Sequence, residues 1–175
     1  MEFRAIARVE IGRIWREIDR TEFVCSIYRA KNGELVEEKM DFDTKGWPPG
    51  EEQKYLPLLQ ECYDRGGFFY AAFHNEKLIG IVVLESKFIG KNKDQLQLKF
   101  LHVGHDFRNK GLGTKLFTIA VNEARKRGAR ELYVSSCPSK NTVDFWLHRG
   151  CVMTDDVDEE LYLLEPEDIH LVYRL

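Results

Sequence analysis

The stretch FLHVGHDFRNKGLGTKLF, residues 100–117, carries the most informative pattern in the chain. An apolar run gives way to a basic loop with two glycines, and an apolar pattern of helical spacing then begins. Backbone N–H groups at the start of a helix bind phosphate well, and glycines let a ligand approach them closely. Gly111 and Gly113 meet that need, and Arg108 and Lys110 add positive charge. The loop therefore indicates a ligand that carries phosphate.

The spacing of this loop excludes two common nucleotide-binding loops. A P-loop ends in Gly-Lys-Ser or Gly-Lys-Thr, whereas the order here is Gly113-Thr114-Lys115, with no glycine at the required distance before it. The dinucleotide fingerprint needs a third glycine at position 116, where Leu116 stands. A Gly-x-Gly loop alone is equally compatible with a plain helix start, so the flanking segments must decide.

The composition bounds the class of protein. A length of 175 residues, 43% of them hydrophobic and 31% charged, suits one globular domain. The net charge of −3 gives no electrostatic reason to expect nucleic acid. No apolar run is long enough to cross a bilayer and no signal peptide is evident, so we expect a cytoplasmic protein without a membrane partner. The four cysteines form no CxxC pair, and we expect neither disulfides nor a metal.

Hydrophobic periodicity predicts a mixed α/β domain. The expected helices are 11–18, 51–65, 112–127 and 139–149. The expected strands are 3–10, a hairpin over 22–43 that turns at Asn32-Gly33, then 68–73, 78–84, 94–107, 129–136, 151–153, 158–165 and 168–175. Within the strand at 94–107, alternation predicts Leu96, Leu98 and Phe100 on one face.

Three motifs around the loop stand at characteristic distances. Leu101-His102-Val103 ends the strand before it, and the loop itself reads Arg-x-x-Gly-x-Gly from Arg108. The helix after the next strand carries Phe145-Trp146, followed by Gly150-Cys151. In residue type and spacing this combination resembles the GNAT superfamily of N-acetyltransferases. The resemblance is firm over roughly 95–155, extends in weaker form over 66–94, and is only an outline over 1–65.

The resemblance implies a fold and a division of the chain. The fold would be α/β (α+β), with a mixed, mostly antiparallel central sheet flanked by helices. That sheet would splay between the strand that ends at Val103 and the strand at 129–136. Residues 1–175 would form a single domain, in which 1–65 is a variable acceptor-side region, 66–155 the coenzyme-binding core and 156–175 the closing strands.

The resemblance also implies acetyl-CoA as co-substrate and an amine as acceptor, with direct attack in a ternary complex. The pyrophosphate would lie on the amides of 108–114, and the pantetheine arm would run beside the backbone of Leu101 and Val103. Whether the acyl group is longer than acetyl, and whether a homodimer forms, stays open. The expected coenzyme-binding residues are Leu101, His102, Val103, Arg108, Asn109, Lys110, Gly111, Leu112, Gly113, Thr114, Asn141, Phe145 and Trp146.

One residue departs from the family pattern. Trp146 stands where members often carry a tyrosine whose hydroxyl protonates the leaving thiolate, and an indole N–H is far too weak an acid for that task. Three alternatives remain: the thiolate leaves unaided, another group such as Ser136, Cys137 or Tyr133 serves, or the chain is an acyl-CoA sensor or scaffold with little turnover.

The general base and the acceptor pocket are less well defined. The strand before the loop offers no carboxylate, so His102 is a candidate base, followed by His105. Glu22, Asp41, Asp43 and Glu85 are further candidates that only coordinates can rank. Tyr28, Asp43 and Trp47 are expected to shape a pocket for a cationic amine. The competing interpretation is that Trp47 is a packing anchor and that the acids are solvated.

Overall fold

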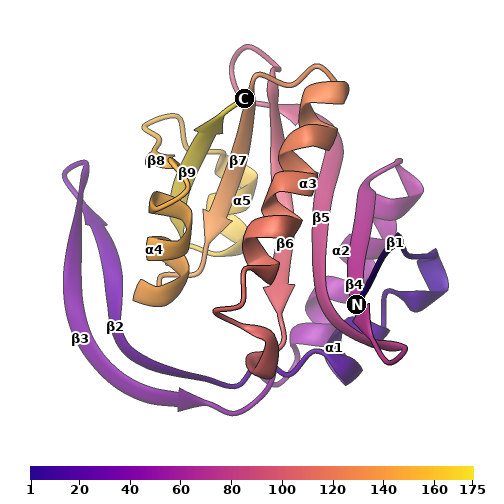
Figure 1. Cartoon of the computed structure of the whole chain (residues 1–175). Helices are drawn as coiled ribbons and strands as arrows, with labels where there is room; N and C mark the ends of the chain where they lie inside the picture. Colours follow the sequence, from indigo (N-terminus) through magenta and orange to yellow (C-terminus); the bar gives the residue numbers. More distant parts are fainter.

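The computed structural model describes residues 1–175 and is built around a seven-stranded sheet (Figure 1). The spatial order is β1-β4-β5-β6-β7-β9-β8. All neighbouring strands are antiparallel except β6 and β7, which are parallel. The strands of this sheet are β1 (Glu2–Ala5), β4 (Phe68–His74), β5 (Lys77–Ile89), β6 (Gln95–Val103), β7 (Glu131–Ser136), β8 (Val152–Met153) and β9 (Ile169–Arg174). The expected mixed, mostly antiparallel fold is confirmed.

Helices cover both faces of the sheet and create two apolar cores. The larger core joins Leu116 of α3 and Val143 of α4 to one face, and the smaller joins Ile14 of α1 and Leu59 of α2 to the other. Two single 3-10 turns cover Arg8–Glu10 and His105–Phe107. The helices are α1 (Arg13–Glu17), α2 (Glu51–Asp64), α3 (Leu112–Lys126), α4 (Lys140–Leu147) and α5 (Glu159–Leu164). None is long and apolar enough to span a bilayer.

The sheet opens between β6 and β7. These strands pair over three residues only, from Gln95 opposite Glu131 to Gln97 opposite Tyr133, and then diverge (Figure 1). Since β6 continues to Val103, the edge of β6 that faces β7 has no strand partner beyond Gln97. The splay that the sequence predicted is therefore present.

A bulge in β6 corrects one prediction. Leu98 pairs with Leu84 but Phe100 pairs with Val83, so Lys99 is an extra residue in β6. A bulge of one residue reverses the alternation of faces after it. Leu98 therefore lies in the core beside α3, while Phe100 lies in the core beside α1 and α2. The expectation that Leu96, Leu98 and Phe100 share a face was wrong.

A second correction concerns residues 158–165, which form helix α5 rather than a strand. The Asp158 carboxylate accepts a hydrogen bond from the Leu161 amide at 3.0 Å, and Glu159 and Glu160 lie in the first turn. This N-cap and the favourable interaction of acids with the helix dipole outweigh the strand tendency of the Leu and Tyr residues. The closing segment 156–175 thus contributes one strand, β9.

The predicted hairpin is a separate two-stranded arm formed by β2 (Glu22–Lys31) and β3 (Glu34–Thr44). Its turn at Asn32-Gly33 has positive φ at both residues, as the Asn-Gly pair predicts. The Tyr28 amide donates to the Pro138 carbonyl at 2.8 Å, which fixes the arm against the start of α4. The arm therefore runs along the open side of the splay (Figure 1).

Candidate functional site

Two cavities meet where β6 and β7 separate. The first, of about 250 Å³, lies between the start of α3 and α4, and the second, of about 510 Å³, lies between α2 and the start of β9. Residues from β6, from the segment after β7 and from α4 line both cavities. The shared lining residues are Arg20, Leu101, His102, Cys137, Thr142 and Trp146. The two cavities are therefore adjacent and share one wall.

The glycine loop leaves backbone donors free at one end of the first cavity. Gly111 is the N-cap of α3 with φ of 78°, a left-handed conformation that favours glycine. The first helical bond runs from the Lys115 amide to the Gly111 carbonyl at 3.0 Å. The amides of residues 112–114 consequently have no partner, as at any helix start. This geometry fits a bound anion.

Gly113 has a different role from Gly111. A Cβ at Gly113 would lie 3.0 Å from Cε2 of Phe145, so the absence of a side chain lets α3 pack directly against α4. A Cβ at Gly111 would meet nothing within 4 Å. The two glycines that the sequence treats alike therefore serve helix packing in one case and backbone conformation in the other.

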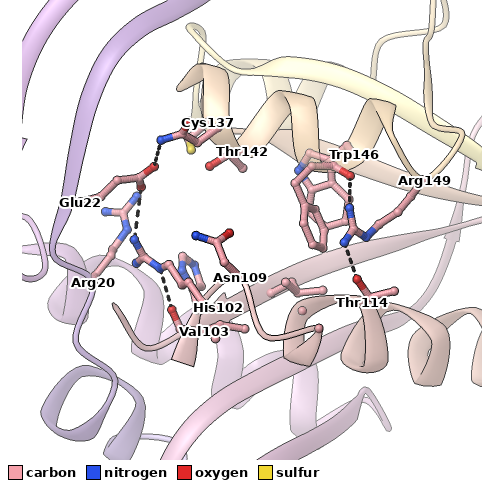
Figure 2. A pocket seen from close by; sticks show the side chains of 16 residues that line it. Arg20, Glu22, His102, Val103, Asn109, Thr114, Cys137, Thr142, Trp146 and Arg149 are labelled. Atoms are coloured by element: carbon pink, nitrogen blue, oxygen red, sulfur yellow. Dashed lines mark hydrogen bonds and ion pairs between the residues drawn. The ribbon is translucent and has the colours of Figure 1, made fainter. Parts of the chain in front are cut away.

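The two loop cations point away from the free amides. Arg108 donates through Nε to the Val103 carbonyl and through Nη1 to the Thr21 carbonyl, both at 3.0 Å. It thereby ties the loop to the end of β6 while still lining the first cavity (Figure 2). Lys110 is exposed and donates to the Asp106 carbonyl at 2.7 Å. Neither Lys110 nor the buried side chain of Leu112 lines a cavity.

Arg149 supplies a cation that the sequence analysis did not consider. Its guanidinium lies 3.4 Å above the Phe145 ring, donates to the Phe145 carbonyl at 2.6 Å and contacts Thr114 Oγ1 at the start of α3 (Figure 2). Its Nε is buried without a partner. A positive charge therefore stands beside the free amides of α3, which increases the fit of this end of the cavity to phosphate.

Trp146 occupies the junction of the two cavities. Only 5% of the residue is exposed, and its Nε1 donor is buried without a hydrogen-bond partner. Buried donors in native structures are nearly always paired, so this indole N–H is an exception, and it is too deeply buried to open into either cavity. The expected coenzyme residues Phe145 and Trp146 both line the first cavity.

Asn141 and Glu22 close the first cavity on the side of the arm. The Asn141 side-chain amide donates to Glu22 Oε1 at 3.1 Å, and Glu22 lies 3.8 Å from Arg108. Both residues line the first cavity together with Asn109, whose φ is 58°. The candidate base Glu22 is thus held between an amide and a guanidinium.

His102 lines both cavities and is held by aromatic rings. Its ring centroid lies 4.8 Å from that of Trp47 and 4.3 Å from that of Phe100. Burial lowers the pKa of His102 well below its usual range, and the charges of Arg20 and Arg108 add to this effect. The imidazole is accordingly neutral and weakly basic.

The three candidate acids are placed differently. Ser136 lines the second cavity and donates to the Cys137 carbonyl at 3.0 Å, and Cys137 lines both cavities. Tyr133 lies outside both, because its hydroxyl is engaged with His170 Nδ1 at 2.7 Å and with the Asp158 amide at 3.0 Å. Burial raises the pKa of Tyr133 to about 12.

The predicted acceptor residues lie outside the two cavities. Tyr28, Asp43 and Trp47 line neither cavity. Tyr28 is bound to Asp144 and Lys140 at the side of α4, and Asp43 is exposed, since both belong to an arm that leaves the sheet. Trp47 donates to the Ile18 carbonyl at 2.8 Å and packs behind the cavity wall. The loop that follows it does contribute, through Pro48, Pro49 and Gly50.

Four carboxylates line the second cavity, and three of them are paired with cations. Glu51 lies 3.1 Å from Arg20, Glu165 contacts Lys54 and Tyr55, and Glu167 contacts Arg29 of the arm. The fourth, Asp168, has no cation within 4 Å and accepts a hydrogen bond from Ser135 at 2.8 Å. Burial raises the pKa of Asp168 to about 6, and the nearby Glu165 adds to the shift. No group of three or more potential metal ligands is present.

A family model identifies the chain. The model described as the Acetyltransferase (GNAT) family matches residues 24–151, which is well over half of the sequence. The chain belongs to this family. The match includes the glycine loop, both splayed strands and the helix that carries Trp146, so it confirms the resemblance found in the sequence. GNAT is a family of acetyltransferases, which are acyltransferase enzymes.

Individual GNAT proteins agree with this assignment. An uncharacterised N-acetyltransferase of Schizosaccharomyces pombe is 27% identical over 89 residues, and these cover 51% of this chain and 61% of that relative's length. Nourseothricin acetyltransferase superposes with a TM-score of 0.70 at 19% identity, covering 98% of this chain and 95% of that one. A Bacillus anthracis protein described as a streptothricin acetyltransferase, solved with acetyl coenzyme A, gives a TM-score of 0.70 at 18% identity, covering 99% and 96%. At these identities the two structures establish the fold.

Several residues of this GNAT site were missed in the sequence. Arg20, Glu51, Tyr55 and Asp168 come from distant segments and reach the second cavity only through folding. Arg149 stands next to Gly150, which closes the helix, and that position was the one local signal for it. The other base candidates lie elsewhere, because Asp41 is exposed on the arm and buried Glu85 is bound to Arg65 at 2.9 Å.

Proposed function

We propose that the chain transfers an acetyl group from acetyl-CoA to a primary amine by direct attack in a ternary complex. The observation that carries this proposal is the pair of cavities that meet at Trp146, one beside a free helix N-terminus with Arg149 and one lined by carboxylates. The first suits a phosphate-bearing donor, and the second suits an amine. Family membership supports acetyl transfer as the reaction.

The donor would bind in the first cavity. The free amides of residues 112–114 and the guanidinium of Arg149 would hold the pyrophosphate. The unpaired edge of β6 would accept the extended pantetheine arm as an added strand, near Leu101 and Val103. The complex of the streptothricin acetyltransferase with acetyl coenzyme A, which has the same fold, supports this choice of ligand.

The acceptor would be a cationic amine in the second cavity. Four carboxylates and the cations Arg20, Lys54 and Lys99 line it, so the lining itself carries one net negative charge, and Tyr55 and Phe100 add aromatic surface. Two structural neighbours are named for nourseothricin and streptothricin. Because these neighbours share less than a fifth of their residues with this chain, their substrates do not transfer to it. We therefore propose only the chemical class of the acceptor.

The chain would act chiefly by positioning. Acetyl-CoA, when bound, supplies a thioester whose thiol pKa is near the value of about 8.5 for free cysteine, so its thiolate can leave without an acid. The Trp146 side chain, which lines both cavities, would then pack against the donor and exclude water from the junction. Bringing amine and acyl carbon together in one geometry supplies much of the rate acceleration.

A second candidate is an acyl-CoA sensor or scaffold with little turnover. The observation that favours it is Trp146 itself, which replaces the tyrosine common in the family. It shares the donor site with the first candidate but predicts no product with any amine. The two are therefore separated by turnover and not by binding.

A melting experiment tests the donor site. Acetyl-CoA at a hundred times its dissociation constant should stabilise the chain by about 2.7 kcal/mol and raise the melting temperature measurably, because it binds only the folded state. ATP and NAD serve as comparison ligands that carry phosphate without pantetheine. A shift with ATP or NAD and none with acetyl-CoA would contradict both candidates.

A further inference from the structure

We propose that Asp168 is the general base that takes the proton from the acceptor's ammonium group, an inference that rests on the proposed function. The residue stands directly before β9 and lines the second cavity. An amine of ordinary basicity is protonated at neutral pH, and it can attack an acyl carbon only after losing a proton. A carboxylate in the amine's cavity is the group that this step requires.

The place of Asp168 is fixed by two strands of the sheet. Ser135 of β7 donates its hydroxyl to Asp168 Oδ2 at 2.8 Å. β7 and β9 are paired at this point, with Ser136 opposite Ile169. Asp168 is the residue next to β9, and the hydrogen bond from β7 anchors one of its two oxygens, which orients the carboxylate.

The ion pairs of the second cavity single out Asp168 among its carboxylates. Arg20, Lys54 and Arg29 compensate the other three, as described above. A neighbouring cation stabilises the ionised form of a carboxylate and makes it a weaker base. At Glu51 burial outweighs Arg20 and raises the pKa, but the ion pair still occupies that carboxylate. Asp168 lacks such a partner within 4 Å, which leaves it free to accept a proton.

The surroundings of Asp168 give it a basicity near the working pH. Burial is the main cause that raises its pKa to about 6, and Glu165 beyond the end of α5 adds to the rise. Ser135, Lys54 of α2 and Arg20 act in the opposite direction. At pH 7 the group is about nine tenths ionised, yet basic enough to accept a proton, which is the compromise expected of a general base.

The other candidates are less suited to this step. His102 has a pKa lowered well below its usual range, so it accepts a proton poorly. Glu22 lines the first cavity, where Asn141 and Arg108 hold it. The remaining carboxylate near β6, Glu85, is buried against Arg65 and lines neither cavity.

The proposed step balances as follows. An oxygen of Asp168 takes one proton from the acceptor's –NH₃⁺, so the carboxylate becomes a carboxyl and the nitrogen regains its lone pair. The nitrogen forms a bond to the acyl carbon, the carbon–sulfur bond breaks, and its electron pair leaves on sulfur. The second proton of the nitrogen passes through solvent to the thiolate, and Asp168 returns its proton to water.

The test compares Asp168→Asn with the wild type. Thiol release from acetyl-CoA is measured between pH 5 and 9 with spermidine, lysine methyl ester, streptothricin and phenethylamine as acceptors. The variant should lose about 100-fold in kcat at pH 7, a typical contribution of a general base. The loss should shrink toward pH 9, where the amine itself loses its proton. In the wild type, kcat/KM should fall as the pH drops below about 6, and this acidic limb should be absent in Asp168→Asn.

Two further variants and a binding measurement accompany this test. Asp155→Asn changes an exposed aspartate that lines neither cavity, and it should behave as the wild type. Ser135→Ala removes the hydrogen bond that lowers the pKa of Asp168, so it should move the acidic limb to higher pH. Calorimetry should give the same acetyl-CoA affinity for wild type and Asp168→Asn.

Each alternative outcome is informative. If Asp168→Asn keeps its kcat and only raises KM for the amine, Asp168 binds the ammonium and is not the base. A loss of rate in Asp168→Asn that is constant from pH 5 to 9 would also overturn the proposal. So would an acidic limb of the kcat/KM profile that stays at the same pH in Ser135→Ala. If the wild type binds acetyl-CoA but acetylates no acceptor, the transferase proposal fails, and the role of Asp168 fails with it. If Asp168→Asn loses its affinity for acetyl-CoA, the residue acts on the donor site and the proposal is wrong.

Discussion

At the scale of single residues, the site depends on groups whose usual partners are missing. Asp168 lacks a cation, Trp146 Nε1 lacks an acceptor, and the amides of 112–114 lack helical carbonyls. Burial without a partner is unfavourable, so the indole N–H of Trp146 costs stability in the free chain. We infer that a bound donor pairs with the amides and a bound amine with Asp168, which links binding to stabilisation.

The raised pKa of Asp168 predicts a specific dependence of stability on pH. The pKa of Asp168 is about 6 in the folded chain and near its ordinary value of 3.8 in the unfolded chain. Between these two pH values the native state therefore holds more protons than the unfolded state. The free energy of unfolding should therefore fall as pH rises from about 4 to 6, by up to about 3 kcal/mol, and stay reduced above. Asp168→Asn should remove this loss, because the Asn side-chain oxygen can still accept the hydrogen bond from Ser135.

Urea denaturation of the two proteins at several pH values measures the effect. The variant should gain stability relative to the wild type as pH rises from 4 to 7, whereas Asp155→Asn should show no such trend. A difference between Asp168→Asn and wild type that is the same at every pH would contradict the raised pKa of Asp168.

At the scale of elements, the contact between α3 and α4 determines the shape of the donor cavity. Gly113 at the start of α3 leaves room for the Phe145 ring, and Arg149 covers that ring from the other side. The free amides of α3 and the guanidinium are thereby held in one arrangement. A change at this contact should affect both stability and donor binding.

Gly113→Val tests that contact. Its Cβ would stand 3.0 Å from Phe145, and the branched side chain should cost about 1–3 kcal/mol of stability by overpacking. Acetyl-CoA affinity measured by calorimetry should fall as well. Adding Phe145→Leu should recover part of the lost stability, since the smaller side chain relieves the overlap. Strictly additive effects of the two changes would show that the two residues do not interact.

The elements also show what the sequence could predict. Helix α3 and the Asn-Gly hairpin were predictable, because periodicity and turn chemistry are local. The bulge at Lys99 was not, since it depends on the register with β5, and α5 was missed because a single cap at Asp158 outweighed its strand-like composition. Arg20 and Asp168 are 148 positions apart, and no local pattern joins them.

At the scale of the whole molecule, the splay of the sheet creates the site. Three pairs join β6 to β7, and beyond them α4, the arm and the segment before β9 close the opening around two cavities. The basic end lies beside α3 and the acidic end beside α2, with Trp146 lining both cavities. On the basis of this polarity we propose that the phosphate-bearing donor and the cationic acceptor bind on opposite sides.

The most direct test of this account is mass spectrometry of the acceptor after incubation with the chain and acetyl-CoA. With spermidine, lysine methyl ester or streptothricin we predict an acetylated amine in amounts equal to the thiol released, and less product with phenethylamine, which carries a single charge. Binding of acetyl-CoA with no acetylated amine from any of the four, or thiol release by hydrolysis alone, would contradict the transferase.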